Sequence, residues 1–136
     1  MKVVLDTMVW VSYCTSKDGY RHRLVALARR KRVRFFVSEY ILEEIKAVLT
    51  EDLDLSDRFA LLARRAVLRI AKAVDPRPSK RRFVAGDPND DPIVLAALTA
   101  KVDYLVTADK EILKVKKVED VDILTPHQWE EKLLSH

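Results

Sequence analysis

GDPNDDPIVLAALTAKVDYLVTAD, residues 86–109, is the stretch that decides the fold. A polar turn leads into an apolar segment, residues 93–101, which we predict to be a buried helix that has Pro92 at its first helical position. Three acids stand before this helix, where unpaired amides and the helix dipole favour negative charge: Asp87, Asp90 and Asp91. The β-prone run at 104–106 then predicts a short buried strand with Asp109 beyond its carboxyl end.

The rest of the chain alternates in the same way between short apolar runs and amphipathic segments. We expect further strands at residues 2–6, 33–37 and 121–124, and further helices at residues 7–14, 20–31, 39–50, 55–73, 110–113 and 128–134. The helix at 20–31 has a basic side that includes Arg21, and Thr125 to Gln128 form a capping box before the last helix. Such alternation favours a parallel sheet with helices on both faces. The sequence therefore predicts one α/β domain, residues 1–136, built as a three-layer α/β/α sandwich around a mainly parallel sheet of about four to five strands.

Composition excludes several classes of site. The chain has no apolar run of 18 or more residues and no signal-peptide pattern, so we expect a soluble, cytoplasmic protein without a membrane partner. A single cysteine, Cys14, excludes an internal disulfide and a cysteine-based zinc site. Lys and Arg total 25 against 21 Asp and Glu, and this modest excess indicates only some affinity for polyanions.

Four acids are candidates for one site at the carboxyl edge of the sheet, where ligands bind in such folds. Asp6 ends the first strand, Asp91 begins the 93–101 helix, Asp109 follows a strand, and Glu44 borders the apolar face of the helix at 39–50. Four carboxylates in one place would repel, and they would have to take up protons or bind a cation. Oxygen ligands favour Mg²⁺ or Mn²⁺, and such ions can support phosphodiester cleavage.

Each of these residues also has a purely structural interpretation. Asp6 could be a turn or cap residue, Asp91 or its neighbour Asp90 a helix cap, and Asp109 the cap of the helix at 110–113. Glu44 could simply extend from the edge of the core to solvent.

Basic residues on the helix at 55–73 share a second face, and others flank the acidic stretch. They are either a solvated surface or contacts to a phosphate backbone. The residues concerned are Arg58, Arg65, Arg69, Lys72, Arg81, Arg82 and Lys110.

Four ordered motifs resemble the PIN-domain ribonucleases, and in particular toxins of the VapC-like type. They are LDT-V-W-S at residues 5–12, S-x-x-IL-x-E at 38–44, DPNDDPIVLAAL at 87–98 and YLVTADKEIL at 104–113. The resemblance covers nearly the whole chain, and the family's acidic positions match Asp6, Glu44, Asp91 and Asp109. One departure is Met8, which stands where family members often have Asn.

The resemblance implies a Mg²⁺- or Mn²⁺-dependent endoribonuclease acting on single-stranded RNA, an antitoxin partner whose tail blocks the acidic site, and a homodimer. In this hypothesis Asp6, Asp91 and Asp109 bind metal directly or through water, and Glu44 holds a water or a second ion. The side chains that would orient these carboxylates are Thr107, Thr7 and Asp90.

Two other functions are consistent with the same pattern of acids. A receiver-like phosphotransfer module also clusters acids at strand ends, but it needs an acceptor Asp on a middle strand, and the strand at 33–37 is followed by Ser38. The second alternative is an inactive RNA-binding or scaffold protein of the same fold, in which the acids would bind Mn²⁺ poorly.

Overall fold

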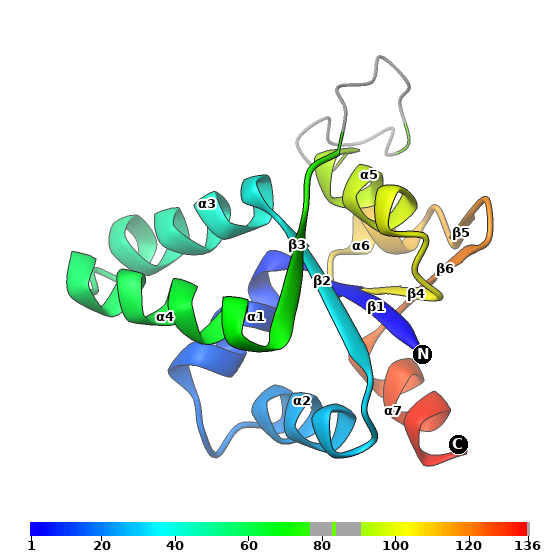
Figure 1. The fold of residues 1–136 in the computed structure, drawn as a ribbon, viewed down its shortest axis with the longest axis horizontal. Coiled ribbons are helices and arrows are strands. Elements are labelled where there is room, and N and C mark those ends of the chain that lie inside the picture. Colours follow the sequence, from blue (N-terminus) through cyan, green and yellow to red (C-terminus); the bar gives the residue numbers. More distant parts are fainter. Residues whose placement is uncertain (77–82, 84–90, 136) are drawn as a thin grey trace.

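A six-stranded sheet forms the centre of the protein, and helices cover both of its faces (Figure 1). The computed structural model describes residues 1–76, 83 and 91–135. The strands are β1 (Lys2–Leu5), β2 (Arg34–Ser38), β3 (Ala71–Val74), β4 (Tyr104–Val106), β5 (Lys117–Val118) and β6 (Val121–Leu124). The helices are α1 (Thr7–Thr15), α2 (Tyr20–Arg30), α3 (Glu39–Ala47), the π-helical η1 (Val48–Asp52), α4 (Asp57–Ile70), α5 (Asp91–Ala100), α6 (Lys110–Leu113) and α7 (Pro126–Leu134).

The strands lie in the order β3-β2-β1-β4-β6-β5, and every neighbouring pair is parallel except β5 with β6. The chain adds β2 and β3 on one side of β1 and then returns to add β4 and β6 on the other side. Because crossovers between parallel strands are right-handed, the helices that join β1, β2 and β3 and the helix α5 that follows β3 cover opposite faces of the sheet. Helix α5 packs across β1, β2, β3 and β4, whereas α1 packs with α2, α3 and α4 on the opposite side (Figure 1). This is the predicted three-layer sandwich with a mainly parallel sheet.

The sheet has six strands, more than the four or five predicted. Strand β3 begins inside the segment predicted as a helix at 55–73. The helix ends at Ile70, and the next four residues pair in parallel with β2. Strand β5 lies in a predicted loop and forms a short antiparallel hairpin with β6. The helix predicted at 39–50 is α-helical only to Ala47 and continues as η1.

Helix caps account for several of the boundaries. Ser38 accepts a hydrogen bond from the Ile41 N–H, and Ser56 accepts one from the Phe59 N–H, so each side chain satisfies an amide of the helix that follows. Thr125 and Gln128 form the predicted capping box at the start of α7.

The hydrophobic core is built from the strands and the inner faces of the helices. Trp10 and Trp129 are fully buried, and both rings contact Phe35 from β2. Within residues 1–76, 83 and 91–135, no helix combines the length and apolar character needed to cross a membrane.

The register of the central strands decides which residues meet at the carboxyl edge of the sheet. Leu5 pairs with Val106, and the Asp6 N–H donates to the Val106 carbonyl over 2.9 Å. The residue that follows each strand is therefore carried to the same edge, which places Asp6 beside Thr107.

Candidate active site

Asp6 is a buried carboxylate held by two hydrogen bonds. Asp6 is 6% exposed, and Thr107 is fully buried. Thr107 Oγ1 donates to Asp6 Oδ2 over 2.6 Å, and the Thr7 N–H donates to Asp6 Oδ1 over 2.6 Å. Asp6 is also the N-cap of α1, so its predicted structural role is real. The two hydrogen bonds fix the orientation of the carboxylate.

The surroundings of Asp6 make its charged form costly. Burial raises the pKa of its carboxyl above the ordinary value, and the negative charge of Asp109 raises it further. The hydrogen bonds from Thr107 and Thr7 and the positive charge of Arg21 act in the opposite direction without cancelling the effect of burial. A buried acid with a second acid nearby gains most from a bound cation.

Asp109 joins this group through Thr107. The Asp109 N–H donates to Thr107 Oγ1 over 3.0 Å, so one hydroxyl contacts both acidic residues. Asp109 Oδ1 accepts hydrogen bonds from the Glu111 and Ile112 amides and caps α6, as the structural interpretation predicted. The residue itself is exposed, which leaves its carboxylate accessible from solvent.

Glu44 is brought to the same region by Thr7. Thr7 Oγ1 donates to Glu44 Oε1 over 2.7 Å, linking the first turn of α1 to α3. Thr7 is 5% exposed and Glu44 is half-buried, so this bond is largely shielded from water. Thr7 therefore contacts one predicted acid through its amide and another through its hydroxyl.

Asp91 is the first residue of α5, the helix that crosses the sheet on the opposite face from α1. It is half-buried, and its Oδ1 accepts a hydrogen bond of 2.9 Å from the Phe83 N–H. Its predicted neighbour Asp90 lies outside the described residues, as do Arg81 and Arg82.

Among the described residues, the acids near Asp6 lie as a pair and not as a larger cluster. Within residues 1–76, 83 and 91–135, no three acidic, histidine or cysteine side chains come together as a metal-binding group. The contacts instead describe a pair, Asp6 and Asp109, with Glu44 held nearby through Thr7. The convergence of four acids on one ion stays a prediction.

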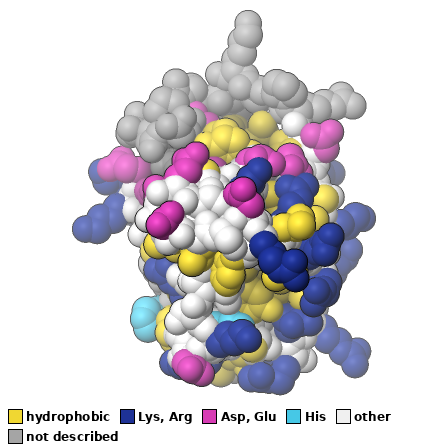
Figure 2. All heavy atoms as spheres, turned by 90° about the vertical axis from the view of Figure 1, so that its left-hand side faces the viewer, with side chains coloured by type: hydrophobic (Ala, Val, Ile, Leu, Met, Phe, Trp, Pro, Cys, Tyr) yellow, Lys and Arg dark blue, Asp and Glu magenta, His cyan; other side chains and the backbone are white. Residues whose placement is uncertain are grey.

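The predicted basic face lies along α4, except that Lys72 falls in strand β3 and not on the helix. Arg58, Arg65 and Arg69 are all exposed, and Figure 2 shows Lys and Arg side chains gathered on one side of this end of the molecule. Because α4 ends where β3 begins, Arg69 stands at the amino edge of the sheet, opposite the edge that carries Asp6. Lys110 is exposed and directly follows Asp109, on the same edge as the acids.

Sequence reasoning missed Arg21, whose charge acts on Asp6. The sequence describes it only as part of the basic side of an amphipathic helix. A usable signal is the short connection between α1 and α2, because helices joined by so few residues pack as neighbours. The first turn of α2 must then lie against α1, the helix that Asp6 caps.

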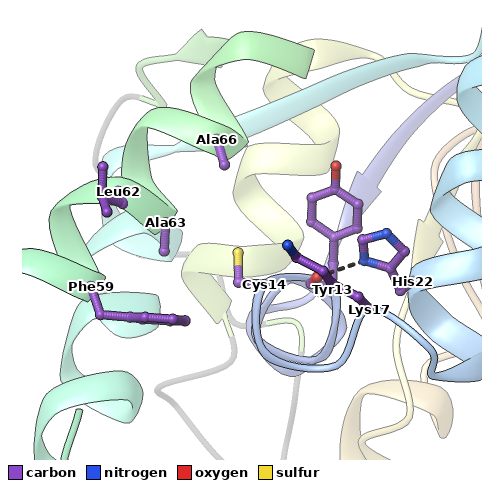
Figure 3. A pocket seen from close by; sticks show the side chains of 8 residues that line it. All are labelled: Tyr13, Cys14, Lys17, His22, Phe59, Leu62, Ala63 and Ala66. Carbon is purple, nitrogen blue, oxygen red and sulfur yellow. Dashed lines mark hydrogen bonds between the residues drawn. The ribbon is translucent and has the colours of Figure 1, made fainter. Parts of the chain in front are cut away.

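A largely apolar pocket of about 240 Å³ lies between α1, α2 and α4 (Figure 3). Tyr13, Cys14 and His22 line one side of it, and α4 lines the other with Phe59 and the small side chains around Ala63. Burial raises the pKa of the Cys14 thiol to about 11, which keeps it protonated and unreactive at neutral pH.

Solved structures of known proteins share this fold. VapBC2 from Rickettsia felis, bound to a DNA fragment from its promoter, matches with a TM-score of 0.63 and 15% sequence identity, over 92% of this chain and 98% of that one. VapC20 from Mycobacterium tuberculosis, described as a toxin that cleaves the sarcin-ricin loop, matches with a TM-score of 0.60 and 16% identity, over 88% and 98%. The PIN domain endonuclease Utp24 matches with a TM-score of 0.56 and 18% identity, over 91% and 84%.

At these identities the likeness concerns the fold, and no curated protein matches the chain. The sequence itself gives the family. The model of the PIN domain matches residues 2–111, which is most of the chain and includes Asp6, Glu44, Asp91 and Asp109. The chain therefore belongs to the PIN-domain family.

Proposed function

We propose that this chain is a metal-dependent endoribonuclease that hydrolyses phosphodiester bonds in single-stranded RNA. The observation that carries the proposal is the buried Asp6 carboxylate, oriented by Thr107 and Thr7 and close to the charge of Asp109. A structural cap alone does not require a second acid whose charge makes ionisation more difficult. Membership of the PIN-domain family supports the same conclusion.

The oxygen donors present fit Mg²⁺ or Mn²⁺. Mg²⁺ keeps several water ligands and is usually bound through one or two carboxylates, so the pair of Asp6 and Asp109 is sufficient to hold it. Asp91 would contribute from the start of α5, directly or through water. When bound, the ion would neutralise the carboxylates and polarise the phosphate of the substrate.

The chain's own residues would orient the reaction. Thr107 would fix Asp6 in the rotamer that presents an oxygen to the ion, and Thr7 would hold Glu44 so that its second oxygen accepts a hydrogen bond from the attacking water. Lys110, next to Asp109, and the arginines of α4 would contact phosphates of the RNA backbone.

We further propose that the protein is the toxin of a toxin–antitoxin pair and acts as a homodimer. The fold of the VapBC2 complex supports a partner of the antitoxin type. The pocket between α1, α2 and α4 would receive an apolar part of that partner (Figure 3). Because α1 begins at Thr7, the residue after Asp6, a partner segment lying along this helix would reach the acidic site.

The direct test is cleavage of an end-labelled single-stranded RNA by the purified chain with Mn²⁺, with Mg²⁺ and with excess EDTA. We expect cleavage only with metal, and loss of cleavage in Asp6→Asn and Asp109→Asn. The matched control is Asp122→Asn, which removes the same charge from β6 at its pairing with Tyr104, away from the carboxyl edge. Metal-independent cleavage, or full activity in Asp6→Asn, would refute the proposal. A folded protein that binds Mn²⁺ poorly and cuts no RNA would favour the inactive scaffold.

A further inference from the structure

Arg21 is a cation near the acidic site to which the proposed function assigns no role. Its Nη1 donates to Ser12 Oγ over 3.3 Å, and Ser12 Oγ donates in turn to the Met8 carbonyl over 3.0 Å. Met8 and Ser12 lie four residues apart on α1, and Met8 is two positions after Asp6. Arg21, on α2, contacts this side of α1. Arg21 is half-buried, and its charge is felt by the Asp6 carboxylate.

The first turn of α2 is held firmly against α1, which restricts where Arg21 can point. His22 Nδ1 is hydrogen-bonded to the Tyr13 carbonyl at 2.8 Å, and the two rings stack with centroids 4.7 Å apart (Figure 3). Gly19 closes the connection: a Cβ there would lie 2.7 Å from Ser16 Oγ, so the Ser16 side chain would have to move to make room for one. The backbone that carries Arg21 is therefore fixed relative to α1.

We propose that Arg21 binds a phosphate of the RNA backbone next to the bond that is cut. The inference rests on the proposed ribonuclease function and names a substrate contact for that site. A guanidinium presents five N–H donors in a planar fork that matches phosphate oxygens, and it remains charged at every accessible pH. Within the described part of the chain, the hydrogen bond to Ser12 is the only one that the guanidinium makes, so its other donors are available to a ligand.

The position of Arg21 distinguishes it from the basic face of α4. Arg69 stands at the amino edge of the sheet, so RNA that contacts it must run well away from Asp6. Arg21 instead contacts α1, the helix that Asp6 caps, through its hydrogen bond to Ser12. Among the described residues no ion pair ties its guanidinium to an acid. A phosphate bound there would lie next to the one held at the acids.

A purely structural role would be to offset the buried charge of Asp6. That role predicts a change in stability and in Mn²⁺ affinity when the arginine is removed, but no change in RNA binding measured without metal. A phosphate contact predicts weaker RNA binding and a smaller dependence of binding on salt, because fewer counterions are displaced. The two readings therefore separate in one titration.

The experiment measures binding of a fluorescein-labelled single-stranded RNA in EDTA, at several salt concentrations, in the Asp109→Asn background so that the RNA stays intact. We expect Arg21→Ala to weaken binding about tenfold. The slope of log K against log salt should fall by about 0.7, the value for one phosphate contact on a single strand. The matched control is Arg23→Ala, which removes the same charge from the same helix about 200° around it and should leave the slope unchanged.

Thermal melting checks that each variant is folded. If Arg21→Ala does not fold, Arg21→Lys and Arg23→Lys replace the pair: the lysine keeps the charge but loses the fork, so only the change at position 21 should weaken binding. Equal affinity and slope for the variants at positions 21 and 23 overturn the inference. Failure of the unsubstituted chain to cleave RNA with Mn²⁺ overturns the ribonuclease proposal instead, so the two failures are distinguishable.

Discussion

Thr107 and Asp6 lie 101 residues apart in the chain, and their side chains are joined by a hydrogen bond of 2.6 Å between Thr107 Oγ1 and Asp6 Oδ2. The pairing of β1 with β4 brings them together, and the same hydroxyl accepts the N–H of Asp109. One buried threonine thus sets the orientation of one acid and the backbone position of another.

Replacing this threonine by valine tests its role, because valine keeps the shape and removes the hydroxyl. Thr107→Val leaves a buried Asp6 oxygen and the Asp109 N–H without their partner, so the free energy of unfolding should fall by about 1–3 kcal/mol at pH 7. RNA cleavage should fall by about 10- to 100-fold, as for other residues that orient metal ligands. Chemical denaturation and initial cleavage rates measure the two effects.

Thr107→Ser is the matched control, because it keeps the hydroxyl and removes a methyl group. Its cleavage rate should stay within a few-fold of the unsubstituted chain. If serine and valine reduce cleavage equally, packing rather than the hydrogen bond explains the role of Thr107.

A second substitution tests the link between Thr7 and Glu44. Thr7→Val removes the hydroxyl that holds Glu44 Oε1 but keeps the amide that binds Asp6. We expect cleavage to fall about tenfold while Mn²⁺ still binds, because the ion's main ligands are untouched. The control is Thr15→Val: this hydroxyl only donates back to the Val11 carbonyl on the same helix. Equal rates for the two variants would remove Glu44 from the reaction.

The raised pKa of Asp6 predicts how stability depends on pH. Burial raises its folded pKa above the unfolded value, so the native state binds more protons between the two values and loses stability as the pH rises through the folded pKa. Asp6→Asn removes this cost and should melt at a higher temperature than the unsubstituted chain at pH 7 in EDTA. The difference should shrink as the pH falls through the raised folded pKa and should be gone below the unfolded value of about 3.9.

Melting curves from pH 3 to pH 8 measure this effect. Adding Mn²⁺ should stabilise the unsubstituted chain and leave Asp6→Asn unchanged, since ligands stabilise only the state they bind. A lower melting temperature for Asp6→Asn at neutral pH would mean that the charge of Asp6 favours the fold and is not held ready for a cation.

The arginines of α4 supply a fourth prediction. If Arg58, Arg65 and Arg69 contact phosphates, changing all three to Gln should lower the salt slope of RNA binding by about 2. Changing Arg29 and Arg30 to Gln, at the end of α2, removes similar exposed charges and serves as the control. An unchanged slope in the triple variant would show that the α4 arginines form a solvated surface.

Much of the fold could be predicted because strong local signals agree with the final packing. The strand at Tyr104–Val106, the helix at Lys110–Leu113 and the capping box at Thr125 are present as predicted. Strand β3 could not be predicted, because its sequence, Ala-Lys-Ala-Val, continues the composition of α4 without a turn residue or a helix breaker. Pairing with β2 outweighs the local preference for helix there.

The candidate site divides in the same way. Positions after strands, such as Asp6 and Asp109, follow from element order, because parallel strands end at one edge. The hydrogen bond between Thr7 and Glu44 depends on the orientation of α3 about its own axis as it packs on α1. The spacing of apolar residues in the sequence does not fix that orientation closely enough to predict a single contact. The charge of Arg21 near Asp6 depends on the packing of α2 in the same way.

The most direct test of the central claim is the anomalous scattering of Mn²⁺ soaked into crystals of the chain and of its Asp6→Asn variant. We predict one peak within about 2.5 Å of carboxylate oxygens of both Asp6 and Asp109 in the unsubstituted chain, and none there in the variant. A peak bound elsewhere, or no peak at a Mn²⁺ concentration that supports cleavage, would contradict the claim that these acids are brought together to hold a divalent ion.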